Sequence, residues 1–211
     1  MARRKSLAFL DVGQGDCFVA DTKSGAIIFD GGSSSEDQVG RYRILPYMKY
    51  LGYQKIQIAV ISHMDIDHYS GIKELLEMGK IKYLGLPEIP KDETMKKIIG
   101  IAKKRGTTIF YLSRGRQITT KDGSLKVLHP QKNSQMEKNA ASLVMQGKIL
   151  GYRVLLTGDV EKEGEEELLS EELERADILK AAHHGSKNST SNEFLLKVQP
   201  KQTVISCGKQ N

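Results

Sequence analysis

The chain has 211 residues, a formal net charge of +6 and only two cysteines. This length can bury a substantial core, and no apolar stretch approaches the ~20 residues of a membrane-spanning helix, so we expect a soluble, cytoplasmic protein. Cys17 and Cys207 lie far apart and form no CxxC pair, which indicates buried free thiols. The positive charge suits an anionic partner, although a solvated lysine-rich surface is the more ordinary explanation for any one basic run.

Short apolar segments bounded by Gly or Asp alternate with helical patterns, which is typical of α/β architecture. The segment 18–30 has the pattern of a hairpin that turns at 23–25, so part of the sheet structure should be antiparallel. This pattern predicts two layers of sheet covered by helices, in one domain. The expected strands are 6–10, 17–21, 26–30, 56–62, 83–86, 108–111, 125–129, 142–146, 153–157, 178–182 and 203–207. The expected helices are 41–51, 70–78, 93–105, 161–175 and 192–198.

A polar cluster follows the apolar segment 56–62 directly. It consists of His63, Asp65, Asp67 and His68, with the spacing H-x-D-x-D-H. A strand-like run precedes the cluster and a helix-like run follows it, so we place it in a strand-to-helix turn, where α/β proteins often carry ligands. Two imidazoles and two carboxylates in one loop can bind a divalent metal ion. The alternative is a structural turn in which the aspartates make only Asx-type contacts.

Two later segments favour the metal site over the structural turn. The run 153–157 leads to Asp159, and the run 178–182 leads to His183 and His184. Three strand-like runs therefore each deliver possible ligands at their C-terminal ends. Four of the five histidines of the chain lie at these positions, so we predict a metal site that all three segments build.

These residues resemble the metallo-β-lactamase fold hydrolases, whose signature is an H-x-H-x-D-H loop, a later Asp and a later His. The chain is similar to the subgroup that includes the hydrolase domain of ComEC-type DNA-uptake competence proteins. The resemblance implies an α/β fold, the metallo-β-lactamase αββα sandwich of two mixed sheets covered by helices. The segments that carry it are FLDVGQGDCF at 9–18, IIFDGG at 27–32, SHMDIDHYSG at 62–71, NAASLV at 139–144, LLTGDVE at 155–161 and AAHHGSKNSTS at 181–191.

The resemblance also implies one metallo-β-lactamase-like domain over residues 1–211 with two divalent metal ions. His63 and Asp65 correspond to ligands of the first ion. Asp67 and His68 correspond to ligands of the second ion. Asp159 corresponds to the carboxylate that bridges both ions. Relatives usually continue beyond the final SCGKQN, so we expect either a truncation at the C-terminus or a shortened protein.

Two positions depart from the wider family or stay open. The late histidine ligand is His183 or His184, and we prefer His183, with His184 as a supporting or proton-donating group. Asn139 stands where the wider family has a further histidine, and Asp65 stands where most members have histidine. More oxygen and fewer imidazole ligands shift the preference from zinc toward manganese, so the candidate ions are Mn and Zn.

The resemblance implies a hydrolase that cleaves phosphodiesters, with single-stranded DNA as the expected substrate and no defined protein partner. Two metal ions would lower the pKa of a bridging water from ~15.7 toward ~7 and so supply hydroxide. The catalytic residues would be Asp67, which orients the nucleophile, and His184, which protonates the leaving oxygen. One alternative is a hydrolase of the same fold that acts on a phosphorylcholine ester or a cyclic nucleotide. The other is a metal-binding module without turnover.

Two weaker features concern possible ligands. The glycine-rich turns at 13–16 and 30–32 lack the G-x-x-x-x-G-K-[ST] pattern, which argues against a P-loop. The resemblance places Gln14 and Asp16 near the metal site. The basic segment 91–106 most simply buries its apolar side, although its lysines could contact phosphates. No aromatic platform for stacking bases stands out.

Overall fold

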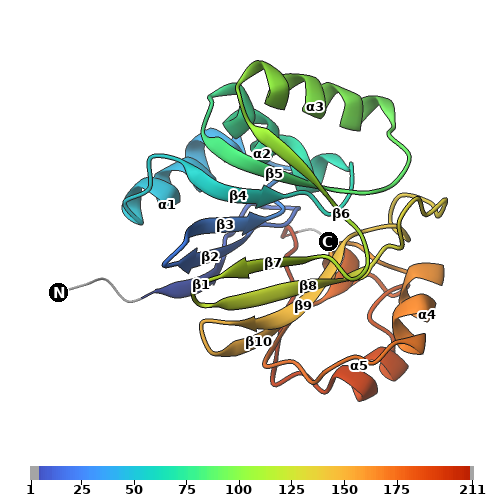
Figure 1. Ribbon diagram of the computed structural model, residues 1–211. Helices are drawn as coiled ribbons and strands as arrows, with labels where there is room; N and C mark the ends of the chain where they lie inside the picture. Colours follow the sequence, from blue (N-terminus) through green and yellow to red (C-terminus); the bar gives the residue numbers. More distant parts are fainter. Residues whose placement is uncertain (1–4, 210–211) are drawn as a thin grey trace.

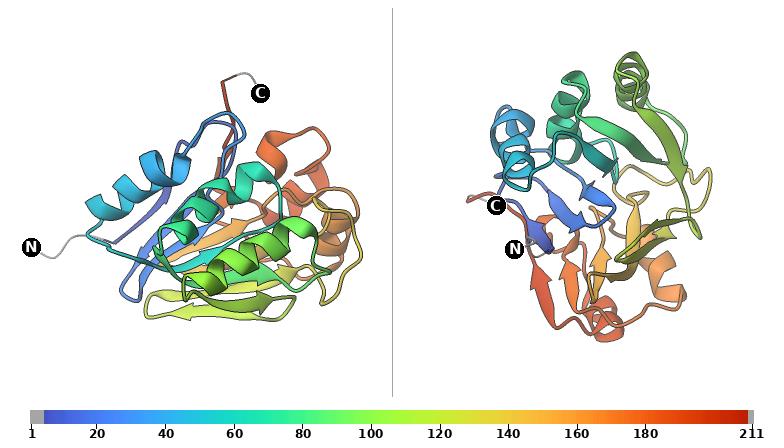
Figure 2. Two further views of the ribbon diagram at one scale, coloured as in Figure 1. Left: turned by 90° about the horizontal axis from the view of Figure 1, so that it is seen from above. Right: turned by 60° about the vertical axis from the view of Figure 1, so that its left-hand side comes forward.

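A computed structural model describes residues 5–209 (Figure 1). The ends of the predicted domain, residues 1–4 and 210–211, lie outside this described part. The chain forms two six-stranded sheets that pack face to face, with helices over both outer surfaces (Figures 1 and 2). The predicted αββα sandwich of two mixed sheets is therefore confirmed.

The first sheet, sheet A, has the strand order β1-β2-β3-β4-β5-β6. The pairs β1/β2 and β2/β3 are antiparallel, which confirms the predicted hairpin, and β3 to β6 run parallel. The strands are β1 (Ser6–Phe9), β2 (Phe18–Thr22), β3 (Gly25–Phe29), β4 (Ile56–Val60), β5 (Ile81–Pro87) and β6 (Thr108–Leu112). The outer face carries a π-helical turn (Gly40–Ile44), α1 (Leu45–Tyr50), α2 (Ile66–Glu77) and α3 (Glu93–Lys104) (Figure 1).

The second sheet, sheet B, has the strand order β12-β11-β10-β9-β8-β7. Strands β7 to β10 are antiparallel, and β10, β11 and β12 run parallel. The strands are β7 (Gln117–Thr120), β8 (Gly123–His129), β9 (Val144–Ile149), β10 (Tyr152–Leu156), β11 (Ile178–Lys180) and β12 (Gln202–Val204). The helices are α4 (Glu163–Ser170) and α5 (Asn192–Val198), with a 3-10 turn at Ala182–Gly185. We did not predict β7, because its four residues include only one apolar side chain.

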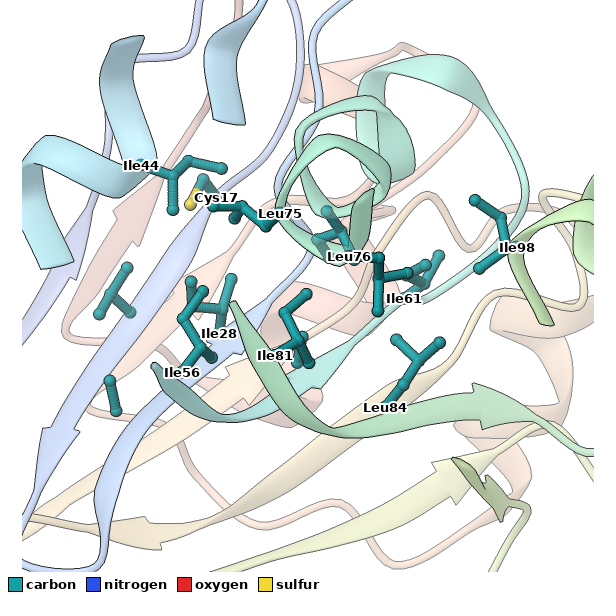
Figure 3. Packing of buried hydrophobic residues seen from close by; sticks show 14 of the residues in the cluster. Cys17, Ile28, Ile44, Ile56, Ile61, Leu75, Leu76, Ile81, Leu84 and Ile98 are labelled. Atoms are coloured by element: carbon teal, nitrogen blue, oxygen red, sulfur yellow. The ribbon is translucent and has the colours of Figure 1, made fainter. Parts of the chain in front are cut away.

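The core has three layers, and strand β3 contributes side chains to two of them. Successive side chains of a strand point to opposite faces. Ala26 and Ile28 therefore pack under the helices of sheet A, whereas Ile27 and Phe29 pack between the two sheets. A strand buried on both faces reads as a continuous apolar run, as the segment 26–29 does. Figure 3 shows the layer under the helices, where Ile28, Leu75 and Leu76 lie. A third layer lies between sheet B and helices α4 and α5.

Helix α2 begins earlier than we predicted, and this changes the setting of the polar cluster. We expected a helix over 70–78, with the cluster in the preceding turn, but α2 starts at Ile66. His68 is fully buried on the same helix face as Ile72, Leu75 and Leu76. A histidine at the first buried position hid the start of the 3.6-residue period. His68 is consequently held by a packed helix rather than by a loop.

The acidic segment is less helical than expected. We predicted a helix over 161–175, but α4 ends at Ser170. Glu171 and Glu172 follow directly, and negative charge near a helix C-terminus opposes the helix dipole. Within residues 5–209, none of the helices has the length and apolar character needed to cross a membrane.

Candidate metal centre

Segments that are far apart in the sequence meet at one end of the sandwich. In sheet A, Phe29 pairs in parallel with Val60, so the chain leaves β3 and β4 at the same edge. Asp30 follows the first of these strands, and its N–H donates to the Val60 carbonyl at 2.8 Å. In sheet B, Leu156 pairs in parallel with Lys180, so the turns after β10 and β11 also share one edge. This topology gathers every segment that we predicted to carry ligands.

Two histidines present Nε2 to the centre because their Nδ1 atoms are held elsewhere. His68 Nδ1 lies 2.9 Å from Asp30 Oδ2, and Asp30 Oδ1 accepts the Ser62 N–H at 2.7 Å. His184 Nδ1 donates to the carbonyl of Ser206 at 2.8 Å. A proton on Nδ1 leaves the Nε2 lone pair available, and such supporting contacts fix the rings of metal-binding histidines. Both imidazoles therefore have the tautomer and orientation of metal ligands.

Asp159 lies in the middle of the centre. Its Oδ2 atom is 3.0 Å from His68 Nε2, 3.5 Å from His184 Nε2 and 4.0 Å from His63 Nε2. Its side chain is almost completely buried. One carboxylate oxygen among three imidazole nitrogens is the arrangement that a bridging ligand requires.

Asp65 and Asp67 lie on different sides of this centre. Asp65 Oδ2 is 3.5 Å from His63 Nε2, and its Oδ1 is 3.2 Å from Lys138 Nζ. Asp67 Oδ2 is 3.3 Å from His184 Nε2. The ligand atoms therefore divide into a half with His63 and Asp65 and a half with Asp67 and His184.

The adjacent histidines His183 and His184 point in different directions. Both have positive φ values, 46° and 52°, in the turn after β11. His184 enters the centre, whereas His183 turns away and its Nδ1 lies 2.9 Å from Glu161 Oε2. The structure thus brings His184 to the other ligand atoms, opposite to our sequence-based preference for His183. The reason is the tight left-handed turn, whose conformation the residue spacing does not reveal.

Three further residues complete the centre, and sequence reasoning found only one of them. We placed Asp16 nearby, but we assigned no role to Asp30 or to Lys180. Ligand atoms of Asp16, His68, Asp159 and His184 lie within 4.8 Å of one another. Asp16, however, faces the Nδ1 atoms of both histidines, at 3.6 and 3.9 Å, and pairs with Lys180. We therefore assign Asp16 to the support of the ligands. The feature of the sequence that could have identified Asp30 and Lys180 is their place at the end of a buried strand.

Asn139, the residue in place of a further family histidine, lies at a pocket beside the centre. This pocket has a volume of about 480 Å³ and is also lined by Lys138 and Glu161. Lys138 contacts Asp65, and Glu161 contacts His183. The pocket therefore opens next to the half of the centre that contains Asp65.

The charges of the centre shift several pKa values strongly. Burial alone would lower the pKa of His68, but the carboxylates of Asp159 and Asp30 outweigh it and raise this pKa well above its usual value. Burial would raise the pKa of Asp159, yet His68, Lys180 and His63 hold it well below its usual value. Contact with His63 lowers the pKa of Asp65 to about 2, against the effect of burial.

Lys180 is charged despite its burial. Burial would lower the pKa of its ammonium group, but Asp16 and Asp159 together raise it. The metal-free centre is therefore a network of buried ion pairs.

The donor set fits a divalent metal ion. The buried Nε2 atoms of His63 and His68 face the carboxylate oxygens of Asp65 and Asp159, at 3.5 and 3.0 Å. Imidazole and carboxylate groups that converge on one point are typical metal ligands. The observed side chains thus form a cluster that suits divalent metal binding.

Metal affinity is expected to increase with pH. The imidazole of His68 stays positively charged at neutral pH in the metal-free protein, with a proton on both ring nitrogens, because its pKa is raised. A metal ion must displace the proton on Nε2, so affinity should rise by up to about tenfold per pH unit for each proton displaced. Isothermal titration between about pH 6 and pH 8, in buffers of different ionisation enthalpy, measures both quantities. Affinity independent of pH, without proton release, would contradict this protonation state.

Two glycines allow the backbone around the centre to approach closely. A Cβ atom at Gly15 would lie 2.2 Å from the Gly32 carbonyl oxygen. A Cβ atom at Gly32 would lie 2.5 Å from the Ile66 carbonyl oxygen and 2.7 Å from His68 N. The glycine-rich turns therefore pack against the N-terminus of α2, which carries Asp67.

Gly32→Ala is expected to destabilise the fold by about 1–3 kcal/mol and to weaken metal binding, because α2 must shift. Urea denaturation and metal titration measure the two effects. Gly100→Ala is the matched control, since a Cβ there meets no atom within 4 Å. This exposed helical position should gain about 0.5–1 kcal/mol. Equal changes in stability and in metal affinity for the two variants would contradict the close packing at Gly32.

The fold and the site together define a class of protein. Two packed mixed sheets carry an H-x-D-x-D-H loop, a later Asp and a later His at one edge, which is the plan of a metal-dependent hydrolase fold. Residues 10–209 match the family model of the Metallo-beta-lactamase superfamily. The chain belongs to this superfamily.

Curated relatives confirm the resemblance to competence proteins. ComE operon protein 3 of Bacillus subtilis is 36% identical over 96% of this chain and 28% of the relative. Recombination protein 2 of Haemophilus influenzae is 29% identical over 96% of this chain and 24% of its own length. Competence protein ComA of Neisseria gonorrhoeae is 29% identical over 95% of this chain and 27% of its own length. The chain thus spans about a quarter of the length of these relatives.

Solved structures show the same fold. The metallo-beta-lactamase fold protein YhfI from Bacillus subtilis has a TM-score of 0.59 and 15% identity, over 92% of this chain and 78% of that chain. Zn(2+)-bound PqqB from Methylobacterium extorquens has a TM-score of 0.53 and 10% identity, over 79% of this chain and 59% of that chain. At these identities the similarity concerns the fold alone.

Proposed function

We propose that this protein is a phosphodiesterase that cleaves DNA with two divalent metal ions. The observation that carries the proposal is the position of Asp159 Oδ2, within 4.0 Å of three imidazole nitrogens. His63 and Asp65 would hold one ion. Asp67, His68 and His184 would hold the other, and Asp159 would join the two sites.

Manganese is the ion that we propose first. Asp65 supplies an oxygen where most of the superfamily has histidine, and Asn139 replaces a further imidazole. Oxygen-rich sites favour harder ions than zinc. Zinc remains the alternative, because it also accepts carboxylates.

The bound ions would supply Lewis-acid chemistry that lowers the pKa of a water and offsets charge on the phosphate. The residues of the chain position and protonate the reacting groups. Asp67 lies at the edge of the centre, where one carboxylate oxygen can orient the attacking water. His183 is held by Glu161 and has a one-third exposed side chain beside the 480 Å³ pocket, so we assign it the protonation of the leaving oxygen. His184 thereby takes the ligand role that we had expected for His183.

DNA as the substrate is supported by the relatives and by charge. One of the relatives is named a competence protein and another a recombination protein, and recombination is a process that acts on DNA. Helix α3 buries Met95, Ile98 and Ala102, as its pattern predicts, and leaves its lysines exposed. Lysines on a solvent-exposed helix face can contact phosphates of any sequence.

A metal titration with a panel of substrates tests the proposal. The chelated protein is titrated with manganese or zinc and assayed on single-stranded DNA, RNA and bis(p-nitrophenyl) phosphate. We expect manganese-dependent cleavage of DNA that weakens at high salt. Turnover of the small diester alone would favour a small-substrate hydrolase. Tight metal binding without any turnover would contradict the proposal and indicate a binding module.

A further inference from the structure

Lys180 is a buried cation directly behind the metal centre. It is the last residue of β11, and its side chain is only 5% exposed. Its Nζ atom contacts Asp16 Oδ2, donates to the Gly158 carbonyl at 2.9 Å and lies 3.4 Å from Asp159 Oδ1. Buried lysines are rare unless paired. The surroundings of this lysine therefore stabilise a positive charge.

The two oxygens of Asp159 face different partners. Oδ1 lies toward Lys180, whereas Oδ2 lies toward the imidazoles of His63, His68 and His184. A metal ion bound at Oδ2 would thus share one carboxylate with the ammonium group. Two cations on one buried carboxylate repel each other, and this repulsion is only weakly screened away from water.

We propose that Lys180 is a resident counter-cation, which stabilises the metal-free centre and weakens its affinity for metal ions. The carboxylates of Asp16 and Asp159 are both almost fully buried. Without a metal, they need a positive charge to remain folded together, and Lys180 supplies it. When metal ions bind, the same charge opposes them. The inference rests on the proposed metal centre and adds a residue that controls how strongly the ions are held.

Lys180→Met tests this role, because it keeps an unbranched side chain of similar volume and removes the charge. The metal-free variant is expected to melt about 10 °C below the wild type, since a buried ion pair loses one partner. Manganese should bind it at least about tenfold more tightly, because the opposing charge is gone. The stabilisation on adding manganese should therefore be larger in the variant than in the wild type. A lysine that only fills space would give lower stability and equal or weaker metal binding, and that result would overturn the inference.

Asp16→Asn is the matched variant, and it is expected to change metal affinity in the opposite direction. It removes the partner of Lys180 that does not bind the metal, so the full ammonium charge acts on Asp159. We expect weaker manganese binding in Asp16→Asn. The double variant Asp16→Asn/Lys180→Met should be more stable without metal than Lys180→Met, because the uncompensated charge of Asp16 is also gone. A double variant whose loss of metal-free stability equals the sum of the two single losses would also overturn the inference.

Thermal melting and isothermal titration after chelation measure all four proteins. Lys201→Met is the control for the chemical change, because Lys201 is exposed and pairs with Asp177 at 2.7 Å. Its melting temperature and metal affinity should match the wild type. If manganese does not stabilise the wild type at all, the proposed metal centre fails. If manganese stabilises the wild type but binds Lys180→Met no more tightly, only the role of Lys180 fails.

Discussion

Asp159→Asn is expected to abolish hydrolysis and to remove tightly bound metal. Asp159 Oδ2 lies within 4.0 Å of three imidazole nitrogens, so both proposed ions depend on it. An amide of the same size keeps the packing but cannot bridge two cations as a carboxylate does. The loss should exceed the roughly 10–100-fold effect of changing a residue that only supports a ligand. Elemental analysis of the purified protein and a phosphodiester assay measure the two effects.

The control for this variant is Asp37→Asn, which makes the same chemical change at an exposed carboxylate. Metal content and turnover should then be those of the wild type. Circular dichroism of Asp159→Asn should show the wild-type secondary structure, since the three core layers do not depend on this carboxylate. Full activity of Asp159→Asn would exclude the bridging role.

Asp30→Asn is expected to weaken metal binding by about 10–100-fold, although Asp30 faces none of the Nε2 atoms. Its carboxylate accepts from two donors, the Ser62 N–H at 2.7 Å and His68 Nδ1 at 2.9 Å. An amide has a single acceptor oxygen, so one of these donors must lose its partner inside the protein. The ring of His68 then loses the contact that fixes its tautomer. Isothermal titration with manganese measures the affinity.

Asp21→Asn is the matched control for Asp30→Asn. Asp21 is an equally buried carboxylate of sheet A, but it lies at the other end of β2 from Asp16 and accepts from Tyr53 and Lys5. Both variants should destabilise the fold. Asp30→Asn leaves a buried donor without its acceptor, and Asp21→Asn removes the negative charge that faces Lys5 at 2.9 Å. Only Asp30→Asn should lower the metal affinity. Equal loss of affinity in the two variants would mean that general destabilisation is the cause.

Much of the fold could be predicted from local patterns. Doubly buried strands such as 26–29 read as continuous apolar runs, and the hairpin between β2 and β3 is marked by its turn residues. The start of α2 could not be predicted in the same way. His68 lies on the buried face of that helix, and a polar residue there breaks the apolar period although it is packed like its neighbours.

The candidate site was only partly visible for a related reason. The H-x-D-x-D-H loop, Asp159 and the histidine pair were found because each follows a strand-like run. Asp30 and Lys180 also lie at strand ends, but a single Asp or Lys in such a place is common. Their importance follows from contacts with residues 38 and 21 positions away in the chain, His68 and Asp159.

The sequence by itself determined most of the segments that become strands and helices, and it placed the ligand candidates at the strand ends. It did so because side-chain periodicity and turn residues act over a few neighbouring positions. The tertiary structure alone decided which side chains meet. The left-handed turn after β11 brings His184 to Asp159 and His183 to Glu161, and parallel pairing brings Asp30 to His68 and Lys180 to Asp159. These contacts depend on which strands pair in parallel and on the local turn after β11, and both bring together residues that lie far apart in the chain. The cost of burying a charge without a partner then favours the paired arrangement.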